Sequence, residues 1–254
     1  MTHRFFLELS FKGTIYHGWQ VQPNATSVQR VVNNALSTIL KKAISVVGAG
    51  RTDTGVHAAF FIAHFDTEIP FSTKQAENRF LKSLNAVLPY DIAIKDVYEV
   101  TPDAHARFSA LKRTYEYTII TEKNPFINDL AWYISTKLDL IQMNQCAASL
   151  LQYDDFTSFS RLHSGSKTNL CRIFEACWTE TGSKLIFSIT ADRFLRNMVR
   201  AIVGTMIDVG KGKTDVDGFK KIIEKRNRGA AGATAPAKGL VLTNLEYPVD
   251  IKKT

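Results

Sequence analysis

Apolar and polar residues alternate at the start of the chain in a way that predicts a strand. Leu7, Leu9 and Phe11 share one face, and Glu8 and Ser10 share the other. Behind Thr26 and Ser27, which are typical helix N-caps, apolar residues recur at helical spacing: Val28, Val31, Val32, Ala35, Leu36, Ile39 and Leu40. The pattern therefore predicts a strand followed by an amphipathic helix.

These two periods continue in an order that occurs twice. Residues 1–105 predict a further short strand near 43–48, a strand at 57–66, a helix at 73–88 and a strand at 91–100. Residues 106–254 predict a strand at 112–121, a helix at 139–152, strands at 170–180 and 184–191, helices at 193–209 and 215–227, and a strand at 239–247. We therefore expect an α+β protein of two ferredoxin-like halves, 1–105 and 106–254, with a mostly antiparallel central sheet.

The composition is that of a globular protein with an uneven positive charge. The chain has 254 residues, 45% of them hydrophobic, and a formal net charge of +8. Residues 106–254 hold 22 basic and 15 acidic side chains, and within them 193–228 hold 10 and 4. Such a local excess suits a polyanion, although a solvated basic helix face has the same composition.

Cysteine usage favours a reducing compartment. Cys146, Cys171 and Cys177 cannot all pair, and no C-x-x-C motif is present. We expect neither a disulfide framework nor a thiolate zinc site, and we expect Cys171 and Cys177 in the core. Because no signal peptide or membrane-spanning run is visible, we expect a cytoplasmic protein.

A glycine-rich loop at 48–57 holds the most unusual chemistry. Three glycines bracket Arg51 and Asp53, which places a carboxylate on a connection that a sheet can hold rigidly. An Asx-turn would explain the same aspartate without catalysis. Asp53-Thr54-Gly55 is also the tripeptide of aspartic proteases, but the chain has no second copy, so only a homodimeric protease would fit.

Three further patterns are candidates for ligand contacts. On the predicted helix 193–209, Arg193, Arg196 and Arg200 share an arc beside Gly204, where a small residue would admit another backbone or a ligand. The separate buried stripe would be Leu195, Met198, Val199, Ile202 and Met206. On strand 112–121, Tyr115 and Tyr117 share a face near Lys112 and Arg113, which suits base stacking or simple packing.

Two other groups of residues leave their role open. Residues 17–20 (HGWQ) suit ligand binding or local folding equally well. Ser158, Ser160 and His163 are residue types found in hydrolases, but no G-x-S-x-G motif accompanies them.

Taken in order, the motifs closely resemble those of the tRNA pseudouridine synthase A (TruA) family. The matching segments are YHGWQ (16–20), GAGRTDTGVHA (48–58), RFSA (107–110), KRTYEY (112–117), FLRNMVR (194–200) and TAPAKGL (234–240). The resemblance covers nearly the whole chain. Thr54 departs from the family's frequent Ala, and Ala237-Lys238 from its Pro-His, while Arg193 and Arg196 replace residues that are often small or aromatic.

The resemblance implies isomerisation of uridine to pseudouridine in the anticodon stem-loop, at tRNA positions 38, 39 and 40. It implies that Asp53 attacks a flipped-out nucleotide, that Arg200 pairs with Asp53, and that Arg51, Tyr115 and Leu240 bind the target base. The RNA-contact candidates are Arg193, Arg196, Lys112 and Arg113. The family also implies no cofactor or metal, and a homodimer that binds tRNA with both subunits. A catalytically silent RNA-binding module is the alternative.

Overall fold

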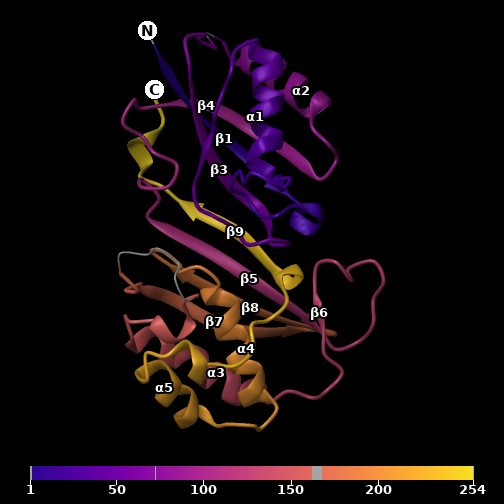
Figure 1. Ribbon diagram of the computed structural model, residues 1–254, viewed down its shortest axis with the longest axis vertical. Coiled ribbons are helices and arrows are strands. Elements are labelled where there is room, and N and C mark those ends of the chain that lie inside the picture. Colours follow the sequence, from indigo (N-terminus) through magenta and orange to yellow (C-terminus); the bar gives the residue numbers. More distant parts are fainter. Residues whose placement is uncertain (1, 72, 162–167, 254) are drawn as a thin grey trace. The chain divides into compact units, whose positions relative to one another are not determined.

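The computed structural model describes residues 2–71, 73–161 and 168–253 and divides the chain into two compact units (Figure 1). Unit 1 comprises residues 1–111 and 242–254, and unit 2 comprises 112–241. The expected division at 105/106 differs from this one, because the chain returns to unit 1 near its end. Backbone hydrogen bonds tie the returning segment there, from Leu111 N to Glu246 O (2.7 Å) and from Thr101 N to Ile251 O (3.1 Å).

Unit 1 has the predicted β-α-β-β-α-β order. Its elements are β1 (His3–Phe11), α1 (Val28–Leu40), β2 (Val47–Gly48), β3 (His57–Thr67), α2 (Lys74–Val87) and β4 (Ile92–Val100). β1 lies between β3 and β4 and pairs antiparallel with both, and β2 pairs antiparallel with β3. The side chain of Ser27 caps α1 by accepting a hydrogen bond from Arg30 N, as predicted. β2 is shorter than the predicted 43–48.

The sheet of unit 1 is covered on both faces. Phe5 on β1 packs on Phe65, which contacts Phe80 of α2, so α2 covers this face. Phe6 points to the opposite face and is also fully buried, since its ring lies 5.4 Å from that of Tyr247. Residues 242–254, the segment that returns to unit 1, therefore cover part of the sheet face on which Glu8 and Ser10 lie. The alternation along β1 predicts that this face is the more polar one.

Unit 2 repeats the same plan with additions. Its elements are β5 (Lys112–Ile120), β6 (Trp132–Tyr133), α3 (Leu140–Ser149), β7 (Ile173–Thr181), β8 (Lys184–Ala191), α4 (Met198–Gly210) and α5 (Val216–Glu224). β9 (Leu240–Glu246) begins in unit 2 and ends in unit 1. β8 pairs antiparallel with β5 and β7, and β6 adds an unpredicted parallel pair to β5. The α+β class with mostly antiparallel pairing is confirmed.

The predicted start of the long basic helix is wrong. α4 begins at Met198 rather than at 193. Asn197 takes a left-handed backbone conformation (φ 69°), which cannot occur inside a continuous right-handed helix, so the helix starts after it. Arg193 and Arg196 therefore lie in the irregular segment before α4 and do not share a helix face with Arg200. The five residues of the predicted stripe are all buried, but so are most other positions of α4.

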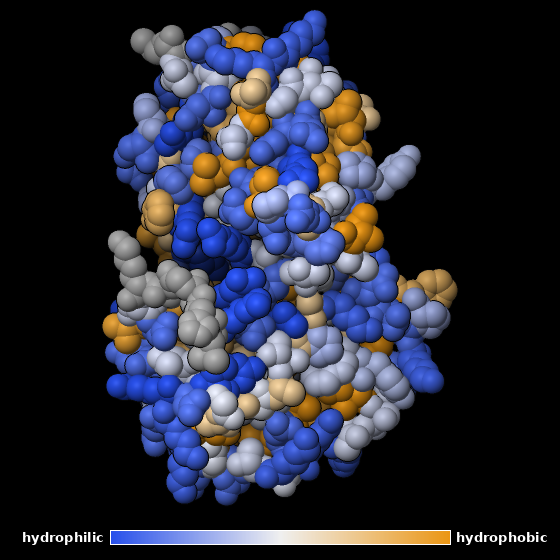
Figure 2. All heavy atoms as spheres, in the orientation of Figure 1, coloured by the Kyte–Doolittle hydropathy of each residue, from blue (hydrophilic) through white to orange (hydrophobic). Residues whose placement is uncertain are grey.

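The surface differs from expectation at one cysteine. Cys171 is buried, as predicted, and burial raises the pKa of its thiol to about 12. Cys177 on β7 is exposed instead, because it alternates with the buried Trp178. Hydrophilic side chains dominate the visible face over α5 (Figure 2). Among the described residues, no helix has the length and apolar character needed to cross a membrane.

Candidate active site

Asp53 lies on a tight turn between β2 and β3. Val56 N donates to Asp53 O (3.2 Å), and Gly55 between them has a φ of 79°, the value that a type II turn needs at its third residue. Asp53 is half-buried and Arg51 is exposed. Of the three glycines in this loop, Gly55 alone has a positive φ, so the unusual backbone is confined to the turn that follows Asp53.

Residues 13–19 hold this loop through hydrogen bonds and one close backbone contact. Gly13 N donates to His57 Nδ1 (2.9 Å, buried), and Gly55 N donates to Tyr16 O (3.2 Å). Gly18 has a φ of 79° and lies so close to the loop that a Cβ there would overlap the Thr52 carbonyl oxygen. The backbone on both sides of Asp53 is therefore fixed by contacts with one neighbouring segment.

Trp19 completes this support. It is 1% exposed, and its ring lies 4.2 Å from that of Phe61 on β3. Its indole also occupies the space that a Cβ on Gly48 would need. The HGWQ segment thus serves local folding of the loop through Gly18 and Trp19.

In unit 2, Arg200 is held by an irregular segment, residues 231–236, that contacts α4. Its Nε donates to Ala235 O (2.8 Å), and Ala235 N donates back to Arg200 O (3.1 Å). One turn further, a Cβ on Gly204 would overlap the Ala233 carbonyl oxygen. The expectation that Gly204 admits another backbone is confirmed.

The same segment reaches Tyr117 of β5. Tyr117 is fully buried and donates its hydroxyl to Pro236 O (2.8 Å), and burial raises the pKa of this phenol. Tyr117 therefore serves packing. Tyr115, half-buried on the same side of β5, meets the ring of Phe194 edge-on at 5.3 Å. Leu240, at the start of β9, is 6% exposed.

Basic side chains gather where β5 and β7 begin and β8 ends. Arg113 donates to Asp192 O (2.6 Å), and Lys112 Nζ lies 5.5 Å from the centre of the Phe174 ring. Arg172 lies over the same ring at 5.4 Å. Arg172 and Phe174 were not predicted, since their positions at the end of a strand become visible only once the register of β7 is known.

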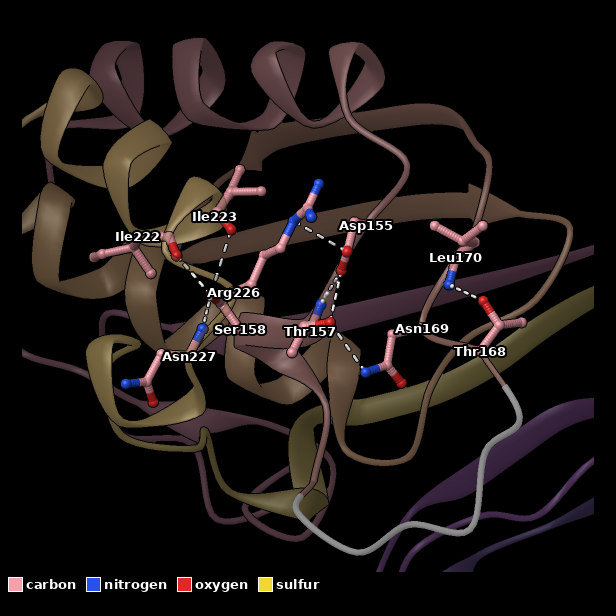
Figure 3. A network of polar contacts seen from close by, with 10 residues as sticks. All are labelled: Asp155, Thr157, Ser158, Thr168, Asn169, Leu170, Ile222, Ile223, Arg226 and Asn227. Atoms are coloured by element: carbon pink, nitrogen blue, oxygen red, sulfur yellow. Dashed lines mark hydrogen bonds and ion pairs between the residues drawn. The ribbon is translucent and has the colours of Figure 1, made fainter.

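A polar network in unit 2 (Figure 3) includes Asp155 and Arg226, which also line a cavity. The volume of this cavity is about 320 Å³, and its lining residues are Tyr153, Asp154, Asp155, Ile223, Glu224 and Arg226. Arg226 pairs with Asp155 (Nε–Oδ2 3.1 Å), and Ser158 donates to Ile222 O (2.6 Å). These contacts join α5 to the segment after α3, so Ser158 has a structural role. His163 lies outside the described residues.

The sequence-predicted site residues thus fall into two groups. Arg51 and Asp53 belong to unit 1, whereas the predicted residues Lys112, Arg113, Tyr115, Arg193, Arg196, Arg200 and Leu240 belong to unit 2. The loop that carries Asp53 is bonded within unit 1, and Lys112, Arg113, Tyr115 and Arg200 form hydrogen bonds or ring contacts within unit 2. Among the described residues, no cluster of three or more His, Cys, Asp or Glu is arranged to hold a metal ion.

The chain is similar to known proteins over almost its full length. Residues 9–109 and 147–248 match the tRNA pseudouridine synthase family. Proteins named tRNA pseudouridine synthase A from Bacteroides fragilis and Porphyromonas gingivalis are each 51% identical, and 98% of each chain is covered in both comparisons. The protein of that name from Bacillus subtilis is 41% identical, with 94% of this chain and 97% of that protein covered. The chain therefore belongs to the tRNA pseudouridine synthase family, a family of isomerases that act on tRNA.

Proposed function

We propose that this protein converts uridine to pseudouridine in the anticodon stem-loop of tRNA, at positions 38, 39 and 40, with Asp53 as the nucleophile. The observation that carries the proposal is the rigid support of the loop around Asp53. Gly18 fits against the Thr52 carbonyl, and the turn from Asp53 to Val56 is closed by a backbone hydrogen bond. A preorganised carboxylate avoids the cost of positioning during the reaction.

The reaction needs only chemistry that side chains supply. The N1–C1′ bond of the uridine breaks and a C5–C1′ bond forms, while the proton on C5 leaves to a base or to water and N1 takes up a proton in its place. A carboxylate can start this sequence by attacking either C1′ of the sugar or C6 of the base. Because the product is an isomer of the substrate, no oxidant or reductant is consumed.

The remaining site residues bind and orient. In this proposal Arg200, whose guanidinium donates to Ala235 O, pairs with Asp53 and orients its carboxylate. Tyr115 stacks on the extruded uracil, and Leu240 lines its pocket. Arg51, exposed on the loop, holds the flipped nucleotide outside the stem.

The basic residues of unit 2 contact the RNA backbone. Lys112 and Arg113 lie at the end of the sheet where Arg172 also lies, and Arg193 and Arg196 follow β8. A homodimer in the cytoplasm would present two such basic regions to one tRNA. Sedimentation of the protein with and without tRNA tests the dimer.

The decisive experiment compares the wild type with Asp53→Ala on unmodified tRNA labelled with tritium at uridine C5. We expect the wild type to release tritium and Asp53→Ala to release none, with a tRNA dissociation constant within about threefold of the wild type. Mapping of pseudouridine then identifies the positions. Turnover by Asp53→Ala would refute the role of Asp53. A wild type that binds tRNA and releases no tritium would be a silent RNA-binding module.

A further inference from the structure

The turn that follows β4 presents an aromatic ring to solvent although its backbone is firmly held. Phe108 is 76% exposed. Arg107, also exposed, places its Cζ 5.4 Å from the centre of the Phe108 ring, and the centre of the His105 ring lies 4.4 Å from the centre of the Phe108 ring. A single exposed apolar side chain is ordinary. The question is why the fold supports this one so closely.

Hydrogen bonds within the turn hold the backbone that carries Phe108. His105 Nδ1 accepts from the backbone N–H groups of Arg107 (3.1 Å) and Phe108 (3.3 Å). Ser109 closes the turn from the other end, because its Oγ accepts from His105 N (3.0 Å) and its N–H donates to His105 O (2.9 Å). These four bonds leave the turn little freedom to withdraw the ring.

Side chains of the sheet and of the returning segment anchor the turn to unit 1. Ala106 is fully buried, with its N–H donated to His64 Nδ1 of β3 (3.1 Å) and its carbonyl accepting the hydroxyl of Tyr247. Arg4 of β1 donates to Ala104 O (3.0 Å). Strands β1 and β3 and the segment after β9 thus all support a turn whose aromatic tip packs on no core.

A rigid aromatic ring with a guanidinium over it is suited to an unpaired nucleobase beside a phosphate. Bases stack on aromatic and guanidinium planes, and a fixed ring loses little conformational entropy on binding. We propose that Arg107 and Phe108 form a stacking contact for an unpaired nucleotide of the tRNA, separate from the uridine that is modified. The proposal rests on the proposed function only in taking tRNA as the substrate.

The test compares four full-length variants in equilibrium binding of unmodified tRNA. Phe108→Ala is expected to weaken binding about tenfold or more, the effect of losing one base–aromatic stack, and Phe108→Trp to retain it. Arg107→Ala is expected to lower the slope of log affinity against log salt by about one, which Phe108→Ala leaves unchanged. Phe126→Ala is the matched control, since Phe126 is 92% exposed in unit 2 and none of the ring or cation contacts found among the described residues involves it.

A second measurement identifies what the ring contacts. Fluorescence of 2-aminopurine placed at unpaired positions of the anticodon loop is expected to be quenched by the wild type and Phe108→Trp, and not by Phe108→Ala. Wild-type affinity in Phe108→Ala would overturn the proposal. So would a loss accompanied by a lower oligomeric mass, since the ring would then join protein chains. The assay measures binding and not turnover, so its result can be interpreted even if Asp53 is not the nucleophile.

Discussion

Replacing Gly18 by Ala tests whether residues 13–19 position the loop that carries Asp53, the proposed nucleophile. The substitution has two costs. A left-handed φ costs a residue with a Cβ about 1–2 kcal/mol. The new methyl also overlaps the Thr52 carbonyl oxygen, and overpacking of this kind costs about 1–3 kcal/mol. We therefore expect the free energy of unfolding of Gly18→Ala to fall by about 2–5 kcal/mol.

Gly212→Ala separates these two costs. Gly212 has a φ of 70°, but a Cβ there meets no atom within 4 Å. We expect this control to lose about 1–2 kcal/mol from backbone strain alone and to keep wild-type turnover. Urea unfolding gives the stabilities, and single-turnover tritium release gives the rates.

The effect on rate distinguishes positioning from general destabilisation. The Thr52 carbonyl directly precedes Asp53, so its displacement moves the carboxylate. We expect the single-turnover rate of Gly18→Ala to fall about 10- to 100-fold under conditions where the protein is folded, with tRNA affinity unchanged. Equal stability and equal rates in the Gly18 and Gly212 variants would refute the reasoning.

Two further predictions concern the supports in each unit. Gly204→Ala pushes a methyl into the Ala233 carbonyl, so we expect a loss of about 1–3 kcal/mol in urea unfolding, whereas Gly50→Ala, which faces open space, is expected to keep wild-type stability. Burial, aided by the charge of Arg4, lowers the pKa of His64 to about 4 from its ordinary 6.5. The unfolded chain therefore binds more protons between these values, and stability is expected to fall by up to about 3 kcal/mol as pH drops from about 6.5 to 4. Urea titrations at several pH values measure this loss, and a wild-type slope in His64→Gln would contradict the assignment.

Most helices and strands could be predicted from the sequence because caps and hydrophobic spacing lie within or next to the element that they define. Ser27 and the apolar period that follows it locate α1 to the residue. The start of α4 was missed because Arg193 to Arg196 continue the helical spacing, and only the left-handed backbone of Asn197 interrupts it. A hydrophobic period carries no information about φ at one residue.

Long-range placement was harder to predict than local structure. Gly204 indicated a close approach, but the partner, the segment around Ala233, lies 29 positions further along the chain. The same holds for the division into units. The hydrophobic pattern of residues 242–254 does not predict that their backbone carbonyls accept hydrogen bonds from Thr101 and Leu111. Such pairings depend on where the chain returns, which a window of neighbouring residues does not contain.

The return of residues 242–254 to unit 1 has a consequence for synthesis on the ribosome. Unit 2 is continuous in sequence, so a nascent chain that has emerged through residue 241 contains all of it. Unit 1 at that stage still lacks Tyr247, which closes over Phe6 and bonds Ala106, and Ile251, which bonds Thr101. Residues 1–111 are translated before unit 2, but unit 1 is completed only after unit 2. One face of its sheet therefore stays partly uncovered until residues 242–254 have been translated.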